Sequence, residues 1–154
     1  MTTGQDSLAV LSAFFAAAPA VARAARPLSR AARVGLELDE GPAAFSMLDG
    51  APVLAGGAPS DPDFTLRLPG AAVARLCADP AAGVGELGVR LFALVLEREP
   101  SLHVGVRVQA PASRLLANGY LAVLALGGPR VALWLLRRGL ADPVAVIERL
   151  RRHR

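Results

Sequence analysis

Alternation of apolar and polar residues with a period of two is confined to the first 109 residues of this 154-residue chain, and it constrains the fold more than any other feature. A period of two is typical of half-buried strands. Five strands are predicted on this pattern, over residues 33–39, 43–48, 52–55, 64–68 and 102–109. Asp49-Gly50, between the second and third of these, indicates a hairpin turn.

Helical patterns precede, interrupt and follow these strands. We expect a first helix that is capped by Asp6, runs to about residue 26 and ends before Pro27. Two more, 71–78 and 84–99, separate the fourth strand from the fifth, and the pattern after Pro111 is helical throughout. A meander of strands with helices packed on one face predicts an α+β fold, a mostly antiparallel five-stranded sheet covered by helices.

Residues 115–126 form a segment that is apolar nearly all round, because only Asn118 and Tyr120 carry polar side chains. A helix of this kind is buried or faces an apolar ligand. The segment is shorter than the ~20 residues that a membrane-spanning helix needs. The apolar N-terminal segment 8–22 follows Asp6 and no basic residue, unlike a signal peptide. We therefore expect a cytoplasmic protein.

All 17 positive side chains are arginines, and the net charge is +4. Two basic groups stand out as candidate contacts for an anionic membrane surface, a stripe at helical spacing and the C-terminal tail. Their members are Arg23, Arg26, Arg30 and Arg33 in the stripe, and Arg149, Arg151 and Arg152 in the tail. The alternative interpretation is that the stripe is only a solvated helix face and that the tail is only a frayed chain end. Nucleic acid is an unexpected partner, since the aromatic residues all lie in apolar contexts.

No catalytic, metal or cofactor site is predicted. The single Cys77 excludes an internal disulfide and a multi-cysteine zinc site, and a buried thiol is the expected role. The glycines of residues 83–88 match the spacing of a dinucleotide-binding turn, but no strand is predicted before them. His103 is expected on the polar side of a strand without a partner, and His153 lies in the terminal tail.

Two stretches resemble the front half of a domain of the sterol carrier protein 2 family. They are residues 45–50, with the sequence FSMLDG, and residues 61–68, with the sequence DPDFTLRL and a short helix after them. Residues 84–126 are similar to the back half. The resemblance covers about residues 33–127, and it departs from the family pattern at both ends of the last strand, around residues 100–102 and 109–110.

This resemblance implies a sheet roofed by helices, with an apolar tunnel between them that takes a sterol, a fatty acyl chain or another lipid. It also implies a division into an N-terminal helix (1–32), a lipid-binding core (33–127) and a C-terminal helical extension with a basic tail (128–154). Binding or transfer of such a ligand is non-enzymatic. The residues that we expect to line the tunnel are Phe92, Val95, Leu96, Leu116, Tyr120, Val123, Leu124 and Trp134.

Two other functions remain open at this stage. The surplus apolar surface suits a protein-interaction or dimerisation module with no small-molecule ligand, and a homodimer is one form of it. An enzyme of another type would require a polar pair, such as His103 with Arg107, to converge in a cleft.

Overall fold

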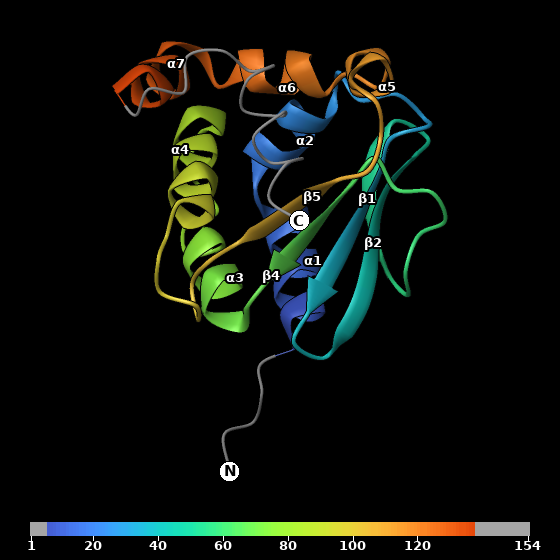
Figure 1. The fold of residues 1–154 in the computed structure, drawn as a ribbon, viewed down its shortest axis with the longest axis horizontal. Helices are drawn as coiled ribbons and strands as arrows, with labels where there is room; N and C mark the ends of the chain where they lie inside the picture. The colour runs from blue at the N-terminus through green and yellow to red at the C-terminus, as the bar shows by residue number, and fades with distance from the viewer. Residues whose placement is uncertain (1–5, 138–154) are drawn as a thin grey trace.

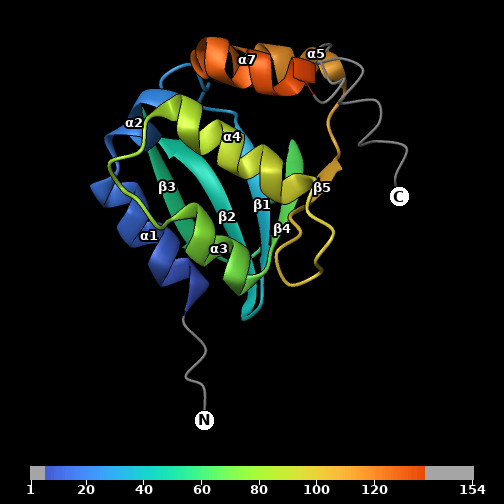
Figure 2. The ribbon, with the colours of Figure 1, turned by 90° about the vertical axis from the view of Figure 1, so that its left-hand side faces the viewer.

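A computed structural model describes residues 6–137, and Figure 1 shows their arrangement. The fold is α+β, with a mixed, mostly antiparallel, open five-stranded sheet and helices gathered on one of its faces, as the sequence predicts. Figure 2 shows helices α1 to α4 in front of the sheet and the layer of α5 to α7 across one end of it.

The sheet has the spatial order β3-β2-β1-β4-β5. The strands are β1 (Arg33–Leu38), β2 (Gly41–Leu48), β3 (Ala51–Gly56), β4 (Phe64–Leu68) and β5 (Gly105–Val108). The expected meander is wrong at one point, because β4 pairs with β1 in parallel instead of with β3. The backbone N–H of Asp63 donates to the Arg33 carbonyl at 2.8 Å, which joins the start of β4 to the start of β1.

The Asp49-Gly50 hairpin is confirmed between β2 and β3. Asp49 has a φ of 51° and Gly50 a φ of 78°. Two successive residues with positive φ form the turn whose twist matches that of the flanking strands, and Asp-Gly is among the sequences that tolerate it.

The expected single N-terminal helix is two helices, α1 (Ser7–Ala17) and α2 (Pro19–Ala25), at 86° to one another. Pro19 causes the break, since it lacks an N–H group and disfavours helical conformation in the preceding residue. Ala18 is extended, with φ −93° and ψ 111°. The cap is confirmed, because an Asp6 carboxylate oxygen accepts from the N–H groups of Leu8 and Ala9.

Between β4 and β5 the chain forms α3 (Gly70–Leu76) and α4 (Val84–Val95). The expected end of α4 at residue 99 is wrong by four residues. The Glu97 carboxylate accepts from the N–H of Arg98 at 2.9 Å, and the Leu94 carbonyl accepts from the N–H of Val104 at 3.0 Å. These bonds stabilise a turn in place of another turn of helix.

The helical region after Pro111 is divided into α5 (Ala112–Ala117), α6 (Tyr120–Leu126) and α7 (Gly128–Arg137). The expected continuous helix over residues 115–126 is therefore wrong. Gly119 has a φ of 92°, and a Cβ at this position would clash with the Pro27 carbonyl. Glycine is the residue that permits both the conformation and the close approach. The part of the expected C-terminal helical extension beyond residue 137 lies outside the described residues.

The main core lies between the inner face of the sheet and the helices. Leu36 and Leu68 of the sheet pack with Leu11, Val73 and Leu94 of the helices, and all five side chains are buried. The opposite face of the sheet carries an exposed ion pair, Arg107 with Glu37. Within residues 6–137 no single helix is long and apolar enough to cross a bilayer; α1 and α2 together meet that criterion of length and composition despite their bend.

Candidate ligand-binding cavity

An apolar cavity of about 330 Å³ lies between the sheet and the helices, and it is partly open to solvent. The volume is within the ~300–1,000 Å³ that is typical of small-molecule sites. No polar atom contributes to its exposed lining. The sheet wall consists of Val34, Leu36, Phe45, Leu54, Phe64, Leu66 and Leu68.

The period-two alternation of the strands produces this wall. Val34 is opposite Phe64 and Leu36 is opposite Leu66 in the parallel pair β1–β4, so their side chains lie on the same face. Phe45 of β2 is opposite Val34 and extends the row across the sheet. Side chains at alternate positions of neighbouring strands line one face, which makes a continuous apolar floor.

The bend between α1 and α2 wraps the N-terminal segment around the cavity. Phe14 and Phe15 line it from α1, and Ala20 and Val21 line it from α2. The Phe15 ring meets the Phe45 ring edge to face, with centroids 6.0 Å apart. A straight helix through Pro19 would place only one of these two segments against the sheet.

Close packing of α4 against α7 forms another wall. A Cβ at Gly88 would lie 2.9 Å from Val131 Cγ2, and a Cβ at Gly127 would lie 2.6 Å from the same atom. Gly88, Gly127 and Val131 all line the cavity. The last glycine of the 83–88 motif therefore serves helix packing, and the element before that motif is helix α3.

Four of the eight side chains expected to line a tunnel do line this cavity: Phe92, Tyr120, Val123 and Leu124. Val95, Leu96, Leu116 and Trp134 do not belong to the lining.

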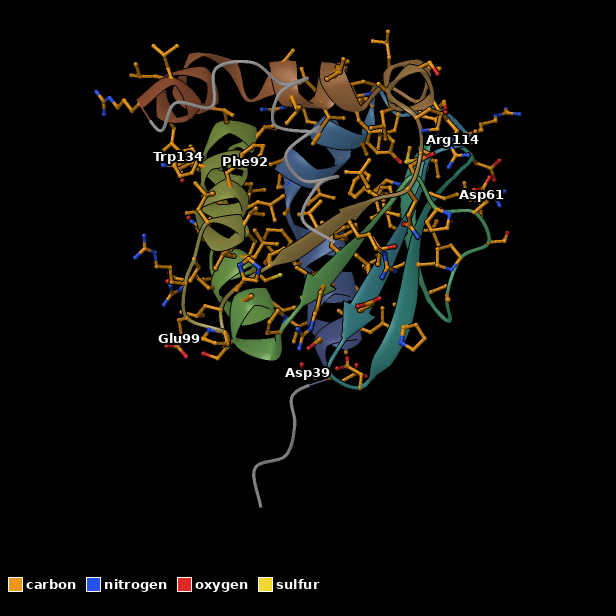
Figure 3. The ribbon with its side chains drawn as sticks, viewed as in Figure 1. Asp39, Asp61, Phe92, Glu99, Arg114 and Trp134 are labelled. Atoms are coloured by element: carbon orange, nitrogen blue, oxygen red, sulfur yellow. The ribbon has the colours of Figure 1, made fainter. Side chains whose placement is uncertain are left out.

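Local structure explains each of these four differences. Helix α4 ends at Val95, which packs at the edge of the core, and leaves Leu96 44% exposed. The break at Gly119 turns Leu116 outward, where it is 62% exposed. The Trp134 ring stacks on the ring of Phe92, with centroids 6.3 Å apart and an interplanar angle of 30° (Figure 3).

A buried carboxylate lies beside the cavity, where β4 begins. Asp63 is 2% exposed, and its Oδ2 accepts from the Tyr120 hydroxyl at 2.6 Å, from Asn118 Nδ2 at 2.9 Å and from the Arg33 N–H at 3.1 Å. Its Oδ1 accepts from Arg114 Nε at 2.9 Å. We call these five residues the Asp63 cluster.

The Asp63 cluster joins the sheet to α5 and α6, which supply Arg114, Asn118 and Tyr120. Sequence reasoning missed its role, although Asp63 belongs to the stretch that carries the family resemblance. The available signal was an aspartate directly before a strand whose inner face is apolar, because a carboxylate that is buried there requires hydrogen-bond donors.

Tyr120 belongs to both regions, since its ring lines the cavity and its hydroxyl donates to Asp63. Burial raises the pKa of Tyr120, and the hydrogen bond to Asp63 raises it further. The hydroxyl therefore stays protonated at neutral pH. Burial also raises the pKa of the Cys77 thiol to about 11, so this thiol is protonated and a poor nucleophile.

The polar pair considered for an enzyme does not converge. His103 Nδ1 lies 3.1 Å from the Glu97 carbonyl oxygen, whereas Arg107 pairs with Glu37 at 3.3 Å. Among residues 6–137, no group of three or more histidine, cysteine or acidic side chains is arranged to hold a metal ion.

The four arginines expected to form one helical stripe lie on different elements. Arg23 is on α2, Arg26 is its C-terminal cap, Arg30 is in the following turn and Arg33 begins β1. All four are exposed. The tail residues Arg149, Arg151 and Arg152 lie outside the described part of the chain.

Comparisons with protein-family models, with curated proteins and with solved structures each found no match to this chain. Function must therefore be inferred from the cavity itself.

Proposed function

We propose that this protein binds a lipid or another hydrophobic small molecule in the cavity between its sheet and its helices, and carries it without enzymatic chemistry. The apolar cavity of about 330 Å³ supports this proposal most directly. A lining without polar atoms stabilises hydrocarbon and offers no hydrogen bond to a polar ligand.

The energetics favour a ligand that fills this space. Mutations that create cavities lower the free energy of unfolding by about 24 cal/mol per Å³ of empty space. At that rate a cavity of 330 Å³ lowers it by at most about 8 kcal/mol, because part of the space is open to solvent. That is comparable to the whole stability of a typical domain, ~5–15 kcal/mol. Each buried methylene of a ligand gains about 0.8 kcal/mol, so ten would gain about 8 kcal/mol before the cost of association.

The resemblance to the sterol carrier protein 2 family is a second ground for the proposal. On this view residues 33–127 are a lipid-binding core of that type, with residues 1–32 and 128–154 as additions to it. The family's ligands include sterols and fatty acyl chains. We therefore expect a ligand whose buried part is hydrocarbon, without a particular headgroup.

Native mass spectrometry of the purified full-length chain tests the proposal. We expect a fraction of the protein to carry extra mass that organic extraction removes, and the extract to contain lipid. A fluorescent fatty acid should bind the extracted protein saturably and be displaced by unlabelled lipid. A chain that carries no lipid and does not bind the fluorescent probe would contradict the proposal.

A matched pair of substitutions on α4 locates the binding site. Leu91 lines the cavity, whereas Leu96 lies outside it. Leu91→Trp should weaken binding of the fluorescent fatty acid at least about tenfold, because the larger ring displaces two or more ligand methylenes. Leu96→Trp should leave binding unchanged. Equal effects of the two substitutions would place the ligand elsewhere.

The competing function is an interaction module without a ligand. The observation that favours it is the exposure of leucines on the outer side of α5 to α7, of which Leu116 is 62% exposed. Under this alternative, native mass spectrometry shows a dimer free of bound lipid.

A further inference from the structure

Exposed leucines gather on the layer formed by α5, α6 and α7. Among the described residues, six large apolar side chains are strongly exposed, and four of them belong to these three helices. They are Leu116 at 62%, Leu126 at 43%, Leu133 at 50% and Leu136 at 61% exposure. We call these four side chains the outer leucine face.

Two of these helices, α6 and α7, face the cavity with their other side. Tyr120, Val123 and Leu124 of α6 and Val131 of α7 line the cavity. The layer is therefore apolar both toward the body of the protein and away from it, and Figure 1 shows it spread across one end of the sheet and of α4. A helix that is apolar all round needs a second apolar environment for its outer side.

The charged side chains on the helices of this layer are all arginines. Residues 110–137 contain no aspartate or glutamate. Arg137 is exposed at the end of α7, and Arg26 and Arg30 are exposed on the segment that bonds to α5 through Ser29 N–H and the Asn118 carbonyl, at 3.1 Å.

Acidic side chains lie mainly elsewhere, apart from Glu86, which is exposed in the first turn of α4, the helix that packs against α7. Figure 3 shows Asp39 and Glu99 at the end of the molecule opposite α5 to α7. The acids in loops at the near end of the sheet are Asp49 and Asp61, and Asp61 is paired with Arg114 at 3.0 Å. The outer leucine face thus has a rim of arginines and no carboxylate on its own helices.

We propose that the outer leucine face docks on the surface of a bilayer that contains anionic phospholipids. The leucines enter the boundary between headgroups and acyl chains, and Arg26, Arg30 and Arg137 lie near the phosphates. Apolar burial combined with a basic rim is how interfacial helices bind membranes. A symmetric dimer through this face would place the two like-charged rims against each other, which favours the lipid surface over a second copy.

This inference goes beyond ligand binding, because docking requires no occupied cavity. It also places the cavity close to the bilayer, since two of the docked helices, α6 and α7, line it. A ligand could then pass between bilayer and cavity along the layer of α5 to α7 without crossing the polar face of the sheet.

Sedimentation of the full-length chain with phosphatidylcholine vesicles, with and without phosphatidylglycerol, tests the proposal. The double substitution Leu133→Ser with Leu136→Ser should weaken partition onto the anionic vesicles at least about tenfold, since two apolar side chains are lost from the contact. The matched control is Leu48→Ser, because Leu48 is also 62% exposed but lies on β2. The control should partition as the unaltered chain does.

Three results would overturn docking: no partition of the unaltered chain onto anionic vesicles, equal partition of double variant and control, or an unaltered dimer that the double substitution converts to a monomer. Thermal unfolding of both variants verifies that they are folded, and Leu126→Ser provides a second variant if the first is unstable. Binding of the fluorescent fatty acid should be normal in the double variant, so a failure of docking is distinct from a failure of ligand binding.

Discussion

The Asp63 cluster and the apolar cavity are neighbouring regions of the interior that share Tyr120, yet they are built on opposite principles. In the cluster the Asp63 carboxylate accepts four hydrogen bonds, and no buried side-chain nitrogen or oxygen in the described residues lacks a partner. In the cavity the lining is apolar and leaves about 330 Å³ that side chains do not fill.

This difference explains how the cavity stays open. Apolar contacts have no preferred direction, so a layer held by them alone would settle onto the sheet. Hydrogen bonds to a buried carboxylate are directional and strong. The Asp63 cluster, together with the bond from Ser29 Oγ to Asn118 Oδ1 at 2.9 Å, fixes the junction of α5 and α6 at the edge of the cavity.

Removal of the carboxylate should have the largest effect. Asp63→Ala removes the acceptor of Asn118 Nδ2, of the Tyr120 hydroxyl and of the Arg33 N–H, which all donate to one buried oxygen. It also removes the acceptor of Arg114 Nε, although Arg114 keeps its bonds to Asp61. We expect a loss of about 3–5 kcal/mol in the free energy of unfolding, measured with urea. Asp61→Asn is the control, because the Asp61 side chain is 82% exposed, and it should cost less than about 1 kcal/mol. Similar losses in the two variants would show that the cluster does not anchor the helices.

Tyr120→Phe keeps the ring in the cavity and removes only its hydrogen bond to Asp63. The expected loss is about 1.5–3 kcal/mol, as for other hydrogen bonds to a charged group. Ligand binding should be retained if the helical layer keeps its place. A loss of stability below about 0.5 kcal/mol would contradict this role of the hydroxyl.

The pH dependence of Tyr120 gives a second measure of the same bond. The raised pKa of Tyr120 means that the unfolded chain releases this proton at lower pH than the folded chain. The protonated Tyr120 hydroxyl therefore contributes fully to the free energy of unfolding below about pH 10, and this contribution is lost as the pH rises further. Tyr120 is the one tyrosine in the sequence, so phenolate absorbance reports on it alone. In the folded protein this absorbance should be absent at pH 10.

Substitution of valine by phenylalanine at two positions compares the stability cost of a larger side chain in the packed core with its cost at the cavity. Val73 is 1% exposed in the packed core, whereas Val123 lines the cavity. Val73→Phe should destabilise the protein by about 1–3 kcal/mol through overpacking, and Val123→Phe by less than about 1 kcal/mol. If Val123→Phe were the more costly substitution in urea unfolding, the cavity would be smaller in solution than in this structure.

The smallest effect concerns Cys77, at the end of α3. Burial raises the pKa of its thiol to about 11, so iodoacetamide should alkylate it slowly at pH 8 and faster as the pH approaches 11. Denaturant should abolish this difference, since the unfolded thiol ionises near pH 8.5. Rapid alkylation of the folded protein at pH 8 would contradict the raised pKa that we expect for this half-buried thiol.

Short sequence motifs predicted caps and turns correctly, but the apolar spacing did not show where a helical segment is broken. The Asp6 cap and the Asp49-Gly50 hairpin were correct, because both depend on residues that are adjacent in sequence. Pro19 and Gly119 both interrupt segments whose apolar spacing predicted one helix. The break at Gly119 also depends on a distant surface, since a Cβ there would clash with the Pro27 carbonyl.

Four of the eight residues expected to line a tunnel line the cavity, because the local apolar pattern identifies the inner faces of their helices. Phe92, Tyr120, Val123 and Leu124 lie on the helical faces that the apolar pattern identifies, and they face the cavity. Leu116 has an equally apolar context, but the break at Gly119 turns it outward. The wall formed by α1 and α2 was not predicted, because a straight N-terminal helix gives no reason to place Phe14 and Ala20 around one space.

The sequence by itself determined the α+β class, the strands and their apolar face, since period-two alternation and turn residues act over a few neighbouring positions. Only the tertiary structure decided that β4 lies beside β1, that Asp63 gathers donors from three elements and that the apolar faces enclose a space. These outcomes depend on volumes and on hydrogen-bond directions that are set by residues far apart in the sequence, such as Tyr120 and Asp63, 57 positions apart, and Ser29 and Asn118, 89 positions apart.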